Sequence, residues 1–196
     1  MNARYRITQT LLNSWLYVYK SDAGWEDFLA TLNRQSKTKT KAMLDGMKFE
    51  NIINACLDGQ ELDNNIEWAE PISKLLPILS GSQKQVTVFK NLVVDGVPFV
   101  LHGVLDFLKA GVIYDTKLSK TYKVGKYLDS PQHPMYFELV PEAYEFQYLI
   151  CDGKYVYKER YRPDEVVPIE YTVRQFMNFL DRENLVDAYC KLWKTK

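Results

Sequence analysis

Residues 85–118 read QVTVFKNLVVDGVPFVLHGVLDFLKAGVIYDTKL, and two turn signals divide this stretch. The Asp-Gly pair at 95–96 supplies the positive φ angles that a tight hairpin needs. The Ala-Gly pair at 110–111 marks a second turn. The segments between the turns are rich in β-branched and aromatic residues, which are typical of strands. We therefore expect three consecutive strands, at residues 85–94, 97–108 and 112–118.

Helical patterns dominate the sequence on both sides of these strands. Residues 5–19 and 41–57 both show apolar residues at helical spacing. The inner face of the second helix is expected to consist of Met43, Met47, Ile52, Ile53 and Leu57. Further helices are expected at 24–35, at 71–80, from Ser130 and Pro131, and near residues 172 and 184, with two more strands at 142–151 and 154–161. This order predicts an α/β protein whose central mixed sheet is covered on both faces.

The composition is that of an ordinary globular protein. The 196 residues are enough for one substantial core, so residues 1–196 are interpreted as a single domain. Hydrophobic residues at 46% and charged residues at 26% argue against a disordered or collagen-like chain. No apolar run approaches the roughly 20 residues of a membrane helix, and the N-terminus lacks the pattern of a signal peptide. We expect a cytoplasmic protein without a membrane partner.

Charge is balanced overall but uneven along the chain. Lys and Arg number 25 and Asp and Glu also number 25, so no global positive field indicates a nucleic-acid partner. Residues 116–127 nevertheless contain four lysines and no acid, whereas residues 58–70 contain five acids and no base. Either run can be a solvated face or a local binding surface. The charge pattern alone leaves both interpretations open.

Asp106, Asp115 and Lys117 are the main candidates for chemistry. Side chains alternate along a strand, so Asp115 and Lys117 project from one face. The turn at residues 110–111 makes the strand of Asp106 an antiparallel neighbour of the strand of Asp115. Asp106 is therefore expected at the same end of the sheet as Asp115. Two carboxylates close together suit Mg²⁺ or Mn²⁺, and a nearby ammonium can activate a water or neutralise charge on a phosphoryl oxygen. The alternative is an ordinary salt bridge where the strand emerges into solvent.

Short motifs in this chain follow the order found in a known family. They are GMKFE at 46–50, GVLD at 103–106, DTK at 115–117 and QHPMY at 132–136. The series resembles the RecB-like branch of the PD-(D/E)XK nuclease superfamily, whose pattern is GxxD, (D/E)xK and QxxxY after a helical GxxxH or GxxxE element. The resemblance covers about residues 5–160. It implies an α/β/α sandwich with a restriction-endonuclease-like core around the mixed sheet.

The resemblance also implies a role for each matching residue. Asp106 and Asp115 would hold the Mg²⁺ or Mn²⁺ ion, with the Thr116 carbonyl as a further ligand. Lys117 would be the catalytic lysine, and Glu50 would approach the metal directly or through water. The remaining candidates would orient the site or contact the nucleic-acid strand, and they are Gln132, Tyr136, Lys120, Lys123 and Lys126.

Two features depart from the family pattern, and one cofactor is not expected. Leu105 stands in place of the proline in the superfamily's name, and Glu50 stands where many relatives have histidine. The three cysteines are too few for the four-cysteine iron–sulfur clamp of some relatives, so no cluster is expected.

The activity implied is that of a divalent-metal-dependent deoxyribonuclease. Exonuclease action in phage biology or in DNA recombination and repair is favoured, with a second copy or a recombination protein as a candidate partner. Two alternatives remain open. One is a nuclease-like fold that has lost catalysis and serves as a DNA-binding or assembly module. The other is an unrelated α/β binding protein in which the motif matches are chance.

Overall fold

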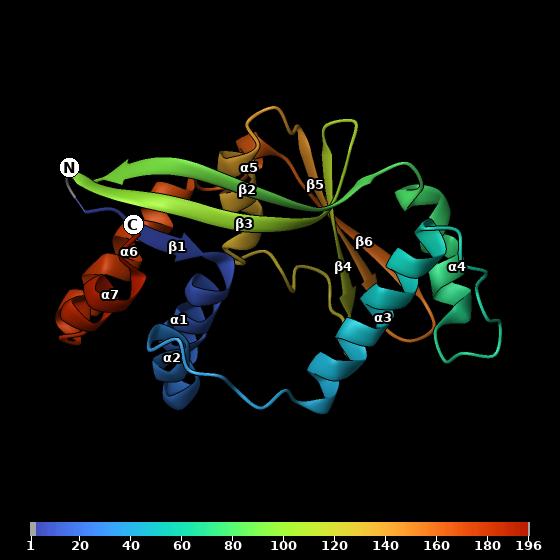
Figure 1. The fold of residues 1–196 in the computed structure, drawn as a ribbon, viewed down its shortest axis with the longest axis horizontal. Coiled ribbons are helices and arrows are strands. Elements are labelled where there is room, and N and C mark those ends of the chain that lie inside the picture. The colour runs from blue at the N-terminus through green and yellow to red at the C-terminus, as the bar shows by residue number, and fades with distance from the viewer. Residues whose placement is uncertain (1–2, 196) are drawn as a thin grey trace.

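The computed structural model describes residues 3–195, which form a six-stranded mixed sheet flanked by helices (Figure 1). The elements in chain order are β1 Tyr5–Thr8, α1 Gln9–Ser21, α2 Trp25–Leu32, α3 Lys41–Leu57, α4 Ala69–Leu79, β2 Gln83–Val94, β3 Val97–Lys109, β4 Val112–Leu118, α5 Gln132–Leu139, β5 Glu145–Cys151, β6 Val156–Tyr161, the 3₁₀ turn η1 Pro163–Glu165, α6 Ile169–Arg182 and α7 Val186–Trp193. The predicted α/β sandwich is confirmed. No helix in the described range is long and apolar enough to cross a membrane.

β3 is the strand around which the sheet is built. β2 pairs with β3 antiparallel along almost its whole length and so fills one edge of it. β1, parallel to β3, and β4, antiparallel to it, must therefore share the other edge. β1 pairs with residues 99–102 and β4 with residues 107–109. Residues 103–106 of β3 consequently lie in a fork between the ends of β1 and β4, and the sheet continues from β4 through β5 to β6.

The N-terminal strand corrects the prediction for residues 5–19. The expected helix begins only at Gln9, where the Thr8 hydroxyl accepts a hydrogen bond from the Leu11 amide, and Tyr5–Thr8 form β1 instead. β1 gains its hydrogen bonds from distant residues, with Tyr5 opposite Phe99. Local periodicity holds no information about such a partner.

Two hydrophobic cores lie on opposite faces of the sheet. Alternate residues of β5 show this, because Tyr148 belongs to the larger core with α1, α5, α6 and α7, whereas Leu149 belongs to the smaller core with α3 and α4. The smaller core covers only the part of the sheet formed by β4, β5 and the ends of β3 and β6. Alternate residues along β2 remain exposed. The expected two-sided cover therefore exists over part of the sheet only.

α3 occupies the predicted residues, and its predicted inner face is confirmed for Ile52, Ile53 and Leu57, which pack in the smaller core, but is wrong for its two methionines. Phe49 and Ile53 are buried, whereas Met43 and Met47 are exposed. The residues of α3 that contribute to the smaller core all come from its second half. The first half extends beyond the sheet, so its apolar side chains have no core to enter.

Candidate active site at the strand fork

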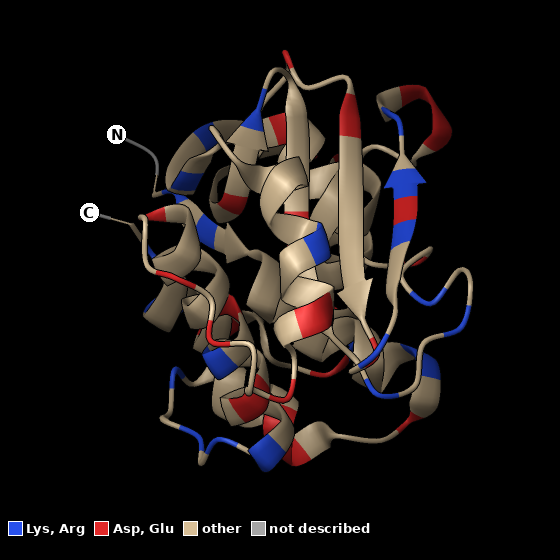
Figure 2. Cartoon of the chain, turned by 90° about the vertical axis from the view of Figure 1, so that its right-hand side faces the viewer, with Lys and Arg blue, Asp and Glu red and all other residues tan. Residues whose placement is uncertain are grey.

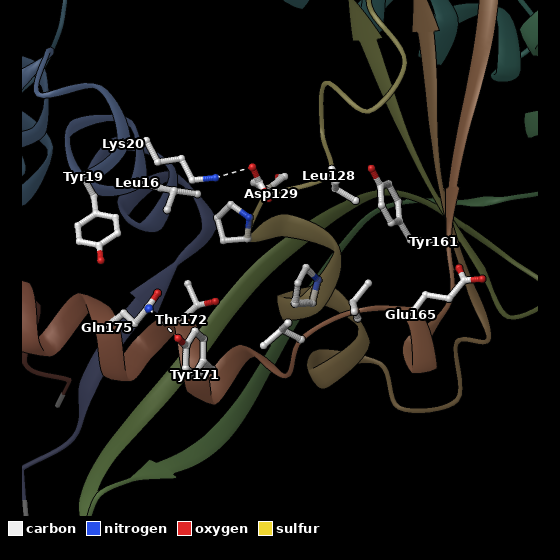
Figure 3. Close-up of a pocket in the computed structure, with 15 residues that line it drawn as sticks. Leu16, Tyr19, Lys20, Leu128, Asp129, Tyr161, Glu165, Tyr171, Thr172 and Gln175 are labelled. Carbon is white, nitrogen blue, oxygen red and sulfur yellow. Dashed lines mark hydrogen bonds and ion pairs between the residues drawn. The ribbon is translucent and has the colours of Figure 1, made fainter.

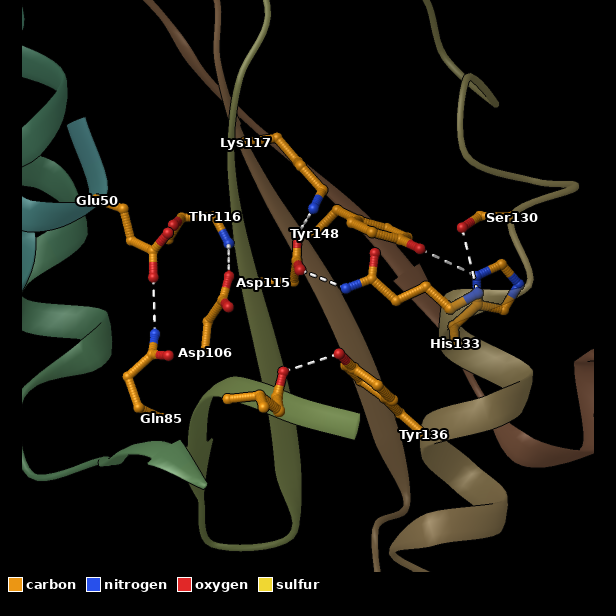
Figure 4. A network of polar contacts seen from close by, with 12 residues as sticks. Glu50, Gln85, Asp106, Asp115, Thr116, Lys117, Ser130, His133, Tyr136 and Tyr148 are labelled. Atoms are coloured by element: carbon orange, nitrogen blue, oxygen red, sulfur yellow. Dashed lines mark hydrogen bonds and ion pairs between the residues drawn. The ribbon is translucent and has the colours of Figure 1, made fainter. Parts of the chain in front are cut away.

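Asp106 and Asp115 lie at the point where β3 and β4 separate (Figure 4). The last opposing pair of these strands toward the fork is Phe107 and Tyr114, so the two aspartates occupy the next positions. The Thr116 amide donates to Oδ2 of Asp106 at 3.4 Å and links the strands. Asp115 is only 2% exposed, and both carboxylates line a cavity of about 380 Å³, the acid cavity. The structure thus brings the two predicted acids together.

Lys117 projects from the same face as Asp115. Its Nζ lies 2.7 Å from Oδ2 of Asp115 and 6.0 Å from the ring centre of Tyr148. Burial alone would lower the pKa of Lys117, but the charges of Asp115 and Asp106 outweigh burial and raise the pKa. Lys117 is therefore held as a cation in this arrangement and is poorly suited to accept a proton near neutral pH.

α5 contributes Gln132 and Tyr136, which take different roles. The Gln132 side-chain amide donates to Oδ1 of Asp115, so this carboxylate is held between Lys117 and Gln132. Tyr136 is buried, and its hydroxyl donates to the Val104 carbonyl in the fork at 2.8 Å. Gln132 is therefore placed to orient the Asp115 carboxylate. The Tyr136 hydroxyl is engaged by the strand instead of being free for a ligand.

Gly103 lets α5 lie directly against the fork. A Cβ at this position would be 2.8 Å from Cε1 of Tyr136 and 2.7 Å from Cδ1 of Leu139, which is closer than real Cβ contacts. The hydrogen bond from Tyr136 to Val104 restrains the ring from moving away. The close packing of α5 thus explains why the first residue of the GVLD motif, Gly103, is a glycine.

Gly103→Ala is expected to lower the free energy of unfolding by about 1–3 kcal/mol, because the added methyl overpacks this contact. Gly46→Ala is the matched control, since Gly46 lies within α3 and a Cβ there meets no atom within 4 Å. Alanine at 46 should stabilise the helix by up to about 1 kcal/mol. Urea denaturation measures both changes in the free energy of unfolding. If Gly103→Ala is as stable as the wild type, α5 can shift to accommodate the methyl group and the packing argument is wrong.

Glu50 reaches the acid cavity from α3. Its Oε1 accepts a hydrogen bond from Nε2 of Gln85 at 2.7 Å. Burial, followed by the charge of Asp115, raises the pKa of Glu50. The predicted approach of this residue to the two aspartates is therefore present, and the hydrogen bond from Gln85 restrains its carboxylate.

Gln85 is a site residue that sequence reasoning missed. It has a φ of 51° and is absent from the ladder, which passes from the Lys84–Phe107 pair to the Val86–Leu105 pair. A positive φ in a residue other than glycine is strained, and such strain is often found at functional sites. Gln85 does not line the acid cavity, but its side chain contacts Glu50, which does, so the irregularity of β2 lies beside the cavity.

The start of α1 also forms part of the acid cavity, through Thr8, Gln9 and Thr10. The N-terminus of a helix carries a partial positive charge and free N–H groups. Sequence reasoning missed these residues because it placed them inside a helix beginning at residue 5.

Negative charge exceeds positive charge in the acid cavity. Among the described residues that line it, three carry carboxylates, Glu50, Asp106 and Asp115, and one, Lys117, carries an ammonium. Burial, followed by the charge of Asp115, raises the pKa of Asp106 well above its usual value, and Lys117 opposes this only in part. A divalent cation at this position would relieve the repulsion.

The donor set fits Mg²⁺ or Mn²⁺. Asp106 and Asp115 offer the hard carboxylate oxygens that these ions prefer. Oδ2 of Asp115 and Oγ1 of Thr116 are buried without a hydrogen bond, although Oδ2 is at ion-pair distance from Lys117. Among residues 3–195, no group of three or more His, Cys, Asp or Glu side chains is arranged so that it could hold a metal ion by itself. Waters and a backbone carbonyl would complete the coordination, as is usual for Mg²⁺.

The predicted phosphate-contacting lysines lie outside the acid cavity. Lys120, Lys123 and Lys126 are exposed in the segment after β4. Lys126 donates to the Thr121 carbonyl at 3.1 Å, and Lys120 and Lys126 line a hollow of about 550 Å³ beside the start of α3. Figure 2 shows basic and acidic residues interspersed over the elements in view, in keeping with the balanced composition.

Another hollow, of about 340 Å³, lies at the far end of α1 (Figure 3). Its wall includes Tyr19 and Tyr171, and its lysine, Lys20, is paired with Asp129 at 2.6 Å. This lysine and this aspartate compensate each other, whereas in the acid cavity three carboxylates share the ammonium of Lys117. The acid cavity is therefore the stronger candidate for chemistry.

The fold is shared with a protein of known structure. The chain is similar to the protein described as "Crystal structure of SSO0001", with a TM-score of 0.58 and 12% identity over 92% of this chain and 78% of that chain. At this identity the similarity shows the α/β fold alone. No protein-family model matches the chain, and no curated protein sequence matches it. Function must therefore be argued from the residues of the site.

Proposed function

We propose that this protein is a divalent-metal-dependent deoxyribonuclease of the RecB-like PD-(D/E)XK type, acting as an exonuclease on DNA in the cytoplasm. The observation that carries the proposal is the meeting of Asp106, Asp115 and Lys117 in one cavity. An ordinary salt bridge would require neither a second nor a third carboxylate beside it. Recombination or repair of DNA, including phage DNA, is the process that such an enzyme would serve.

The residues of the acid cavity would have different roles in the reaction. Asp106, Asp115 and the Thr116 carbonyl would hold Mg²⁺ or Mn²⁺, which supplies an activated water and offsets negative charge on the phosphate. Gln132 keeps Asp115 oriented. Lys117, as a cation, would neutralise the charge that develops on a phosphoryl oxygen. Glu50, held by Gln85, would bind at the opposite wall, directly or through water.

Cleavage of defined DNA substrates tests this proposal. Linear and circular DNA, each single- and double-stranded, are incubated with the protein in Mg²⁺, Mn²⁺ or EDTA, and the products are sized. The expected result is metal-dependent degradation of linear DNA, with circular DNA left intact. Cutting of circles would assign an endonuclease instead. Survival of all four substrates in both ions would refute nuclease activity.

A catalytically inactive DNA-binding or assembly module is the second candidate. It is favoured by the contacts of Asp115 with Lys117 and Gln132, which satisfy much of this buried carboxylate without an ion. Titration calorimetry with Mn²⁺ separates the two candidates. Heat of binding accompanied by DNA degradation supports the enzyme, and DNA binding without metal binding supports the module.

A further inference from the structure

One face of β1, β2 and β3 is open to solvent and leads to the acid cavity. The opposite face of β2 and β3 is covered by α5, and that of β2 also by α6. In the register of these strands, Phe89 lies opposite His102 and Asn91 opposite Val100, while Arg6 and Thr8 of β1 face Val100 and His102. We call the residues of this face the open strip, and they are Arg6, Thr8, Thr87, Phe89, Asn91, Val100, His102 and Val104. Figure 1 shows β2 and β3 running from the end near the chain termini to the point where β4 begins.

The middle of the open strip is an exposed aromatic pair. Phe89 is 59% exposed, and its ring stacks on His102 with centroids 4.6 Å apart and planes at 25°. His102 also lines the acid cavity. It precedes Asp106 by four residues, which corresponds to about 14 Å along a strand. A flat apolar surface therefore lies a short distance from the two metal-binding candidates.

The far end of the open strip is basic. Arg4, Arg6 and Asn91 line a hollow of about 260 Å³ together with Phe89, and no Asp or Glu is among the described residues that line it. Arg4 donates to Oδ1 of Asn91 at 3.1 Å. Guanidinium groups are well suited to phosphate oxygens, because they present several N–H donors in one plane. This end of the strip is complementary to an anionic ligand.

We propose that the open strip guides a single strand of nucleic acid into the acid cavity, with Phe89 and His102 stacking an unpaired base and Arg4 and Arg6 contacting phosphates. The inference rests on the proposed function, since the path ends at Asp106. Exposed aromatic rings combined with basic groups are the usual means of binding single strands. The bases of an intact duplex are already paired and stacked, so only unpaired nucleotides can reach the Phe89 ring.

Binding measured without cleavage tests this path. Fluorescence anisotropy with a labelled single-stranded oligonucleotide in EDTA is expected to show affinity reduced about 5- to 100-fold in Phe89→Ala, as is usual for loss of one stacked base. Phe89→Trp should retain the affinity. Tyr155→Ala is the matched control, because Tyr155 is an exposed aromatic immediately before β6, beside Lys154. This variant should bind like the wild type.

A second oligonucleotide isolates the stacking contribution. With abasic sites in place of all bases, wild type and Phe89→Ala should bind with equal affinity, since no base remains to stack. Arg6→Gln should weaken binding of both oligonucleotides, because it removes a phosphate contact. A difference between wild type and Phe89→Ala that persists on the abasic oligonucleotide would overturn the assigned role of Phe89.

Other results would also overturn the inference. One is equal affinity of wild type and Phe89→Ala for the normal oligonucleotide. Another is a wild-type dimer that Phe89→Ala dissociates in sedimentation. Among the described strands β2 pairs with β3 alone, so its free edge could receive a second copy. Binding that depends on Phe89 without any cleavage would remove the nuclease proposal and keep the open strip. Cleavage of DNA together with binding that is unchanged in Phe89→Ala would support the nuclease proposal and overturn the role of the open strip.

Discussion

Lys117→Gln is expected to slow cleavage of linear DNA by about 10²–10³-fold, the usual effect of removing one group that stabilises charge in a transition state. The ammonium lies 2.7 Å from Asp115, and the charges of Asp115 and Asp106 keep it protonated. Glutamine keeps the approximate size and can still donate a hydrogen bond, but it carries no charge. The fold should survive, since the Lys117 side chain is 32% exposed and ends in the cavity.

Lys158→Gln is the matched control for this prediction. Lys158 is an exposed residue of the edge strand β6 and does not line the acid cavity. Single-turnover cleavage rates of the two variants are compared with Mg²⁺ present, and thermal unfolding verifies that both are folded. If Lys117→Gln cuts as fast as Lys158→Gln, the chemistry lies elsewhere.

The acid pair of the site could be predicted because short turns determine it. Asp95 and Gly96 have φ angles of 50° and 80°, as the predicted hairpin requires, and Ala110 and Gly111 have 48° and 77°. The second turn sets the register of β3 against β4, and that register places Asp106 across from Asp115. Every step of this inference uses residues close together in the chain.

The parts of the site that could not be predicted depend on distant contacts. β1 exists because it pairs with the middle of β3, and the positive φ of Gln85 arises where the ladder between β2 and β3 is interrupted. The prediction that Met43 and Met47 of α3 are buried was wrong for a related reason, whereas Ile52, Ile53 and Leu57 do pack in the smaller core. Apolar spacing shows that Met43 and Met47 share a helix face, but not that the sheet ends before it reaches them.

The Gln132–Tyr136 spacing shows both the reach and the limit of sequence patterns. Four residues on a helix place two side chains on one face, and both do line the acid cavity. Their hydrogen bonds nevertheless diverge, with Gln132 on Asp115 and the Tyr136 hydroxyl on Val104. The Val104 carbonyl can accept this hydrogen bond because it lies in the fork. The fork depends on the pairing of β1 and β4 with one edge of β3, which the spacing of residues on a helix does not show.

Asp106→Asn is expected to stabilise the metal-free protein near neutral pH and to abolish metal-dependent cleavage. Burial, followed by repulsion from Asp115, raises the pKa of Asp106 well above its usual value of 3.8. A carboxyl group with a higher pKa in the folded state binds more protons there than in the unfolded state. Wild-type stability should therefore increase as pH falls from the folded pKa toward 3.8. Asparagine at position 106 does not titrate, so the variant should lack this dependence of stability on pH. Unfolding measured in EDTA at several pH values tests this.

Mn²⁺ should reverse the order of stabilities. An ion at 100 times its Kd stabilises the protein that binds it by about 2.7 kcal/mol, and Asp106→Asn, which lacks a ligand, should gain little. Glu142→Gln is the control, because Glu142 is exposed and outside the acid cavity. This variant should respond to Mn²⁺ like the wild type.

The combination of results for Asp106→Asn is diagnostic because structural damage cannot produce it. Structural damage at a partly buried position lowers stability with and without an ion. A lost metal ligand instead gives an inactive protein that is more stable than the wild type without the ion and is not stabilised by it. An equal rise in melting temperature with Mn²⁺ in wild type and Asp106→Asn would mean that the ion binds elsewhere. The repulsion between Asp106 and Asp115 would then have no function in metal binding, and the nuclease proposal would lose its physical basis.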